Sequence, residues 1–165
     1  MSWKHRHATR EDLPAIVEIY NATIPSRLVT ADLEPVSVES RIGWFEQHKP
    51  NSRPLWVAEH DGRIAGWLSL SNFYARPAYH KSAELSFYVD ETFRHRGLGS
   101  HFLTQATAHA PSLGIDRLIG FVFGHNQPSQ RLLKKFDFRC WGNLPGVTRL
   151  DGIERDVIIF GRIIS

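Results

Sequence analysis

The spacing of apolar residues changes its period along this chain, and that change most restricts the folds open to it. Residues 13–20 carry apolar side chains at the three-to-four-residue spacing of a helix with one buried face. Residues 55–59 and 64–73 are instead rich in aromatic and β-branched residues, and His60-Asp61-Gly62 separates them. This pattern predicts two strands joined by a tight turn. The fold must therefore combine helices with a sheet.

The order of the remaining elements narrows the architecture further. A short strand precedes the first helix, whose start at Thr9-Arg-Glu-Asp12 has the pattern of a helix cap. A second helix is expected from Ser37 to just before Pro50. The later elements expected are strands at 84–89, 117–123, 138–141 and 155–164 and helices at 97–110 and 128–136. Hairpins mixed with strand–helix–strand crossovers predict an α/β fold, a mixed sheet with helices on both faces.

Length and composition bound the class of protein. The 165 residues, 42% of them hydrophobic, suffice for one compact domain over residues 1–165. The net charge of +3 is small and scattered, so we expect neither a nucleic-acid partner nor a membrane partner. No apolar stretch approaches the roughly 18 residues of a membrane span. The first residues lack the apolar core of a signal peptide, and the single Cys140 excludes an internal disulfide, so we expect a cytoplasmic protein.

Residues 85–100 contain the most informative segment. A predicted strand runs into a turn with Gly97 and Gly99, and a helix follows. Glycines let backbone amides approach a ligand, and the positive end of a helix suits a phosphate or pyrophosphate. Arg94 and Arg96 would add neutralising charge. Two such glycines alone indicate no more than a helix-opening turn, because the P-loop lysine and the third Rossmann glycine are absent.

A second segment, residues 121–138, runs from a strand through Asn126 into a helix and on to an aromatic residue. Together the two segments resemble the GCN5-related N-acetyltransferase (GNAT) superfamily, whose acetyl-CoA signature Arg94-x-x-Gly97-x-Gly99 matches. Further stretches are similar to the phosphinothricin N-acetyltransferase-like subgroup. These stretches are residues 9–15, 33–35, 56–66, 83–89 and 126–129.

The resemblance implies a GNAT fold in which two neighbouring strands splay at a bulge and open a cleft for acetyl-CoA. Phe87, Tyr88 and Val89 would pair with the pantetheine arm, and the amide of Val89 or of an adjacent residue would polarise the thioester oxygen. The remaining implied cofactor contacts are Arg94, His95, Arg96, Gly97, Leu98 and Gly99 at the pyrophosphate, and Asn126 and Ser129 at the pantetheine or its acetyl end.

Acetyl transfer requires a neutral amine, so a base must remove a proton from the acceptor. Glu84 stands where the subgroup carries a glutamate proposed as that base, and partial burial would raise its pKa toward neutrality. The alternative is a strand-end charge paired with Lys81 or another cation. Many family members protonate the departing thiolate with a Tyr at the position of Leu133, so the sequence assigns no general acid here.

The subgroup acetylates small amino acids and their analogues, such as phosphinothricin and methionine sulfoximine. The implied partner is therefore a small-molecule amine, and the family also implies a homodimer. Arg76 is the candidate for holding the acceptor carboxylate, and Thr30 and Glu34 would line the same pocket. Solvated loop positions explain these three residues equally well.

Three alternatives remain open. The chain could be a non-catalytic acyl-CoA-binding sensor, or an acetyltransferase for a protein N-terminus or a polyamine. The loops contain no acidic cluster, which disfavours a polyamine. His5-x-His7 would place two rings on one strand face, but the sequence supplies no cluster of three or four ligands, so we expect surface histidines on an edge strand and no metal.

Overall fold

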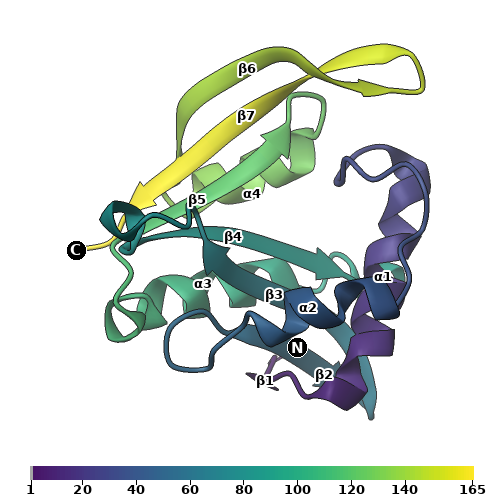
Figure 1. The fold of residues 1–165 in the computed structure, drawn as a ribbon. Coiled ribbons are helices and arrows are strands. Elements are labelled where there is room, and N and C mark those ends of the chain that lie inside the picture. Colours follow the sequence, from purple (N-terminus) through teal and green to yellow (C-terminus); the bar gives the residue numbers. More distant parts are fainter. Residues whose placement is uncertain (1) are drawn as a thin grey trace.

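A computed structural model describes residues 2–165 as a single seven-stranded sheet flanked by helices (Figure 1). The strands are β1 (His5–His7), β2 (Leu55–His60), β3 (Arg63–Asn72), β4 (Ser82–Val89), β5 (Arg117–Phe123), β6 (Arg139–Leu150) and β7 (Ile153–Ile163). The helices are α1 (Leu13–Thr23), α2 (Ile42–Glu46), α3 (Leu98–His109) and α4 (Gln127–Lys135). Within residues 2–165, no helix has the length and apolarity needed to cross a bilayer.

The strand order is β1-β2-β3-β4-β5-β7-β6. Every adjacent pair is antiparallel except β4 and β5, which run parallel. The helix between them, α3, is the crossover that a parallel pair needs. The mixed α/β sheet predicted from the sequence is therefore confirmed.

Each face of the sheet has its own hydrophobic cluster. On one face, α1 and α2 pack against the sheet through a cluster that includes Ile16, Ile19, Leu55, Val57 and Trp67. The other face is covered by α3 and α4. Its larger cluster includes Leu68, Leu85, Leu98, Phe102, Leu103, Leu118, Leu133 and Phe138. The helical spacing of residues 13–20 thus predicted the buried face of α1 correctly.

Two predicted elements differ in extent. The second helix is shorter than expected, because a 3₁₀ turn at Glu39–Arg41 precedes an α2 of only 5 residues. The strand expected at 138–141 instead continues to Leu150. Asp151 and Gly152 both have positive φ (53° and 81°) and close a tight turn into β7. Two register shifts in the β6–β7 ladder accommodate the long hairpin, which extends beyond the rest of the sheet (Figure 1).

The N-terminal segment is attached to α3 rather than free at the sheet edge. The Trp3 indole Nε1 donates to the Arg96 carbonyl oxygen at 2.9 Å. His5 Nδ1 lies 3.0 Å from His101 Nε2 on α3, and the His5 ring packs on Trp56 with a centroid distance of 4.5 Å. β1 is the edge strand, as expected, and His7 is exposed, whereas His5 is only partly exposed because of these contacts. No group of three or more His, Cys, Asp or Glu side chains in residues 2–165 is arranged to hold a metal ion.

This histidine contact makes stability depend on pH. Burial, with His101 and His109 nearby, lowers the pKa of His5 from 6.5 to about 4. Between these pH values the unfolded chain binds more protons at this position than the folded one, so stability falls as pH drops from 6.5 to 4. Between pH 7.5 and 5, the melting temperature of His5→Gln should therefore fall by less than that of the wild type. Differential scanning calorimetry at both pH values would measure this.

His7→Gln is the matched control, because His7 lies on the same strand and is exposed. On acidification, its melting temperature should fall by as much as that of the wild type. An equal loss in His5→Gln and wild type would contradict the assignment of this titration to His5.

Candidate active site

The strands β4 and β5 separate after a short parallel ladder. Their pairing runs only from Ser82–Arg117 to Glu84–Ile119, although both strands continue beyond it. The ladder between β3 and β4 keeps one register from Ala83 to Val89. The expected splay is therefore present, but the expected bulge is not: the strands part where the parallel ladder ends.

The separation leaves backbone groups of β4 facing the gap. The Phe73 amide donates to the Ser82 carbonyl oxygen, and the Asp90 amide donates to the Ala65 carbonyl oxygen. The backbone N–H and C=O groups of the even-numbered residues of β4 therefore face β3. The backbone N–H and C=O groups of successive residues in a strand point to opposite edges. Those of Leu85, Phe87 and Val89 therefore face β5. They can pair with an extended ligand arm inserted as an additional strand. Of the three predicted contacts, Phe87 and Val89 offer this edge, whereas the peptide group of Tyr88 is turned toward β3.

The loop before α3 follows at the end of β4. Phe93 is buried and anchors the loop, while Arg94, His95, Arg96 and Gly97 are exposed. His95 and Gly97 both have positive φ (60° and 81°). Arg96 stands with its guanidinium 5.6 Å from the Phe93 ring. The exposed amides, two arginines and the N-terminus of the 12-residue α3 form a cradle suited to a pyrophosphate.

The two glycines of this loop serve different purposes. Gly97 has left-handed backbone geometry, and a Cβ added there would meet nothing within 4 Å. A Cβ on Gly99 would instead lie 2.9 Å from Leu132 Cδ2 and 3.2 Å from Phe87 Cε2. Gly97 therefore shapes the loop, and Gly99 lets α3 pack closely on β4 and α4. The Leu98 side chain is buried in the core, so only its backbone can reach a ligand.

At the start of α4, Asn126 is buried and caps the helix. Its Oδ1 accepts a hydrogen bond from the Ser129 amide at 3.2 Å. Its Nδ2 donates to no other group in residues 2–165. Leu133 is buried in the core. It therefore provides no proton donor, as the sequence indicated.

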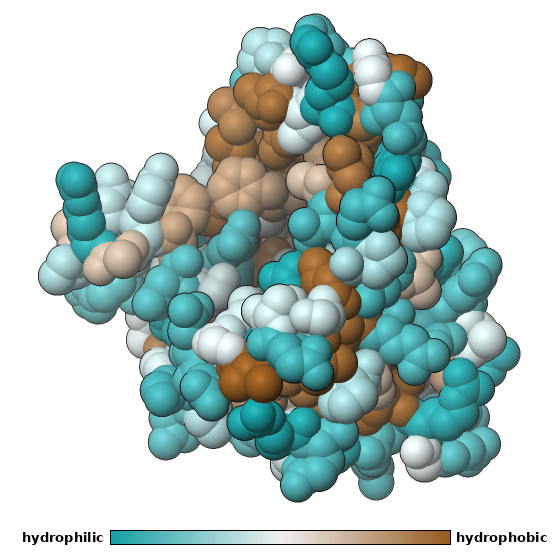
Figure 2. Space-filling model, turned by 45° about the vertical axis from the view of Figure 1, so that its right-hand side comes forward, coloured by the Kyte–Doolittle hydropathy of each residue, from teal (hydrophilic) through white to brown (hydrophobic). Residues whose placement is uncertain are grey.

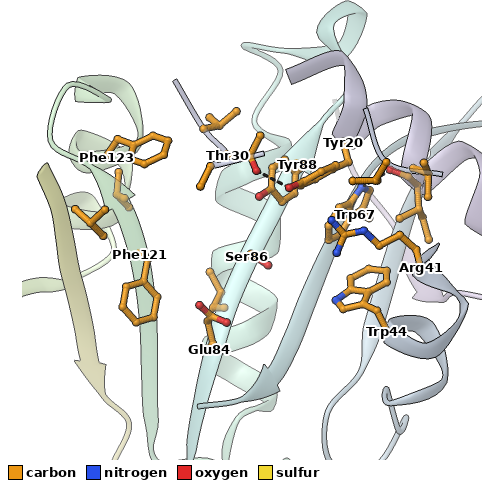
Figure 3. A pocket seen from close by; sticks show the side chains of 18 of the residues that line it. Tyr20, Thr30, Arg41, Trp44, Trp67, Glu84, Ser86, Tyr88, Phe121 and Phe123 are labelled. Atoms are coloured by element: carbon orange, nitrogen blue, oxygen red, sulfur yellow. Dashed lines mark hydrogen bonds between the residues drawn. The ribbon is translucent and has the colours of Figure 1, made fainter. Parts of the chain in front are cut away.

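A cavity of about 350 Å³ opens beside the splayed strands, between them and α1 and α2. Figure 2 shows a hollow near the centre of this face, with hydrophobic side chains around it. Glu84, Ser86 and Tyr88 project into the cavity from one face of β4 (Figure 3). The other labelled lining residues are Tyr20, Thr30, Arg41, Trp44, Trp67, Phe121 and Phe123.

Glu84 is partly buried at the point where β4 and β5 separate. Burial raises the pKa of its carboxyl group, and a hydrogen bond from Ser71 on β3 offsets part of this effect. No basic side chain in residues 2–165 forms an ion pair with Glu84. The alternative, a strand-end charge paired with Lys81 or another cation, therefore has no such pair in the described part of the chain. A carboxylate with a raised pKa in a cavity wall is suited to accept a proton.

The three residues predicted to bind the acceptor are not brought together. Thr30 is buried in the cavity wall. Arg76 and Glu34 are exposed and lie outside the lining of this cavity. Arg41, which was not among the predicted residues, does line it. The helical spacing of Arg41 with Trp44 contained that signal, because residues three apart share a helix face.

The comparisons with known proteins agree with this geometry. Residues 13–138 match the acetyltransferase (GNAT) family. The chain is 51% identical over 161 residues to the Bacillus subtilis protein YwnH, covering 97% of this chain and 98% of that protein. It is 27% identical over 148 residues to the Pseudomonas aeruginosa L-methionine sulfoximine/L-methionine sulfone acetyltransferase, covering 89% of this chain and 86% of the relative.

A solved structure gives the same result. The phosphinothricin acetyltransferase from Sinorhizobium meliloti in complex with acetyl-CoA is 25% identical and superposes with a TM-score of 0.93 over 100% of this chain and 90% of that one. The family match includes the splayed strands, the loop before α3 and the cap of α4. The chain therefore belongs to the acetyltransferase (GNAT) family and uses acetyl-CoA as its acetyl donor.

Proposed function

We propose that this enzyme transfers the acetyl group of acetyl-CoA to the primary amine of a small amino acid or a close analogue. The observation that carries the proposal is the position of Glu84, a carboxylate with a raised pKa in the wall of a cavity that adjoins the cleft. The names of the Pseudomonas and Sinorhizobium relatives support acceptors of the methionine sulfoximine and phosphinothricin type.

In the proposed mechanism, Glu84 removes a proton from the acceptor ammonium, directly or through a water molecule. The neutral amine then attacks the thioester carbonyl carbon, and the amide of Val89 or Phe87 stabilises the developing oxyanion. The carbon–sulfur bond breaks and coenzyme A leaves as a thiolate. The nitrogen then loses its second proton to solvent, and the thiolate takes up a proton from solvent, so no proton from Leu133 is needed. The products are the N-acetylated acceptor and free coenzyme A.

We assign the remaining cofactor contacts to the exposed loop and to the cap of α4. The amides of residues 94–99 would bind the pyrophosphate, with charge from Arg94 and Arg96. Asn126 and Ser129 would contact the pantetheine or its acetyl end. The positive-φ geometry of Gly97 and the unengaged Asn126 Nδ2 support this arrangement.

We also propose that residues 1–165 act as one N-acetyltransferase domain, as a homodimer and in the cytoplasm. Several large apolar side chains of the β6–β7 hairpin are exposed, which supports association through this hairpin. These residues are Trp141, Leu144, Val147, Ile153 and Ile163.

An acceptor panel tests the function. Thiol release from acetyl-CoA should be fastest with L-methionine sulfone, L-methionine sulfoximine, phosphinothricin or another free amino acid. Spermidine and an unblocked peptide should react at least about tenfold more slowly, because neither presents an α-carboxylate beside its amine. Acetyl-CoA binding without turnover on any acceptor would instead support the sensor alternative.

A further inference from the structure

The acceptor cavity contains one residue of each charge. Among the described residues that line it, Arg41 is the one cation and Glu84 the one carboxylate. Most other lining side chains are aromatic or aliphatic. A free α-amino acid also carries one group of each charge at neutral pH. The cavity therefore matches this class of acceptor in both its charges.

Arg41 is held so that it faces the cavity. It ends the 3₁₀ turn before α2, and its guanidinium stands over the Tyr20 ring at 5.1 Å from the ring centroid. Figure 3 shows the guanidinium reaching inward from the turn before α2, between Trp44 and Trp67. Stacking on an aromatic face restricts the plane of a guanidinium without using its N–H donors.

A polar network fixes one end of the guanidinium. Arg41 Nη2 donates to Asp32 Oδ2 at 3.1 Å, and the same oxygen accepts a hydrogen bond from the Tyr20 hydroxyl. The Tyr20 hydroxyl also bonds to Thr30 Oγ1. The loop between α1 and α2 and the helices themselves thus orient Arg41 before any substrate binds.

Most donors of Arg41 remain available to a ligand. A guanidinium has five N–H donors, and the bond to Asp32 is the one hydrogen bond that this side chain makes within residues 2–165. The side chain is 30% exposed, so it is neither buried in the core nor free in solvent. A planar guanidinium with a free edge in a cavity binds a carboxylate through two parallel hydrogen bonds.

We propose that Arg41 binds the α-carboxylate of the acceptor and thereby selects free α-amino acids. The inference rests on the proposed function. A peptide acceptor carries an amide in place of the carboxylate and leaves the free N–H donors of Arg41, beyond its ion pair with Asp32, without an anionic acceptor. A polyamine would bring a second cation beside Arg41. Arg41 thus replaces Arg76, which lies outside the lining of the cavity, as the carboxylate-binding residue.

The test combines one substitution with one change of substrate. L-methionine sulfone and its α-carboxamide differ only in the group that Arg41 would bind. The wild type should prefer the acid over the carboxamide by about 10- to 100-fold in kcat/KM, the effect of one charge-assisted contact. Arg41→Gln should reduce this preference to within about threefold, with the acetyl-CoA KM nearly unchanged.

Matched variants separate binding from structure. Arg76→Gln should keep the wild-type preference for the acid. Arg41→Lys keeps the charge but loses the planar fork, so it should give an intermediate preference, and it provides the test should Arg41→Gln fail to fold. Melting temperatures would verify folding, because both changes disturb the contact with Asp32.

The possible failures are distinguishable. Retention of the acid preference in Arg41→Gln, or its loss in Arg76→Gln, would overturn the role of Arg41 while the proposed function stands. Equal turnover of the acid and the carboxamide by the wild type would also overturn the role of Arg41 and leave the proposed function standing. If the wild type acetylates neither compound nor any other free amino acid, the proposed function itself fails, and the role of Arg41 fails with it.

Discussion

Replacing Glu84 with Gln should lower kcat by about 10²- to 10⁴-fold, the usual contribution of a positioned general base. Gln has nearly the same shape but cannot accept the ammonium proton. The raised pKa of Glu84 also predicts that wild-type kcat falls on acidification at a higher pH than an ordinary carboxyl group would give. This acidic limb should be absent from the pH profile of Glu84→Gln. Steady-state rates of thiol release across pH would measure both effects.

Stability provides an independent readout for the same variant. A raised pKa means that the folded protein disfavours the charged form of Glu84, so the charge lowers stability at neutral pH. The neutral Gln should therefore leave the melting temperature unchanged or higher, and the acetyl-CoA KM should change little. Glu18→Gln, at an exposed position of α1, is the control and should retain wild-type kcat. Wild-type turnover in Glu84→Gln at neutral pH would remove Glu84 from the mechanism.

Gly97→Ala should raise the KM for acetyl-CoA by about 10- to 100-fold. Gly97 has a φ of 81°, and an alanine would resist that conformation by about 1–2 kcal/mol. The loop would shift, and one or more amide contacts to a charged pyrophosphate would be lost, each of about 1.5–3 kcal/mol. Initial-rate kinetics with varied acetyl-CoA would measure the change, and the acceptor KM should move far less.

Gly114→Ala is the matched control for this experiment. Gly114 also has a positive φ, 73°, and its missing Cβ also faces open space, but it lies beyond the far end of α3. Both substitutions should lower stability by a similar amount, and only Gly97→Ala should raise the acetyl-CoA KM. Equal KM values in the two variants would show that residues 94–99 do not bind the pyrophosphate.

The elements predicted best were those with strong local signals. The periodicity of residues 13–20 and the turn at His60-Asp61-Gly62 depend on neighbours in sequence, so the chain alone specified α1 and the β2–β3 hairpin. The extent of β6 was missed, although Asp151-Gly152 is a strong hairpin signal. That turn closes a ladder with two register shifts, and such shifts weaken the simple alternation that marks a strand.

Among the site residues, backbone-determined positions were easier to identify than side-chain partners. Gly97 is recognisable because its position requires a φ that other residues resist. The packing role of Gly99 is not, since it depends on Leu132 and Phe87 from other elements. His5 gave no indication in sequence that it would contact His101, 96 positions away.

By itself, the sequence determined the family, the acetyl donor and the order of the sheet and helices, because local spacing and a short loop signature encode them. Only the tertiary structure decided where β4 leaves β5, how far Glu84 is buried and which arginine lines the acceptor cavity. The network of Tyr20, Asp32 and Arg41 joins α1, a loop and the start of α2. Charges and burial at such a site arise from packing between distant segments, and the helical spacing that links Arg41 to Trp44 does not specify which cavity their shared face lines.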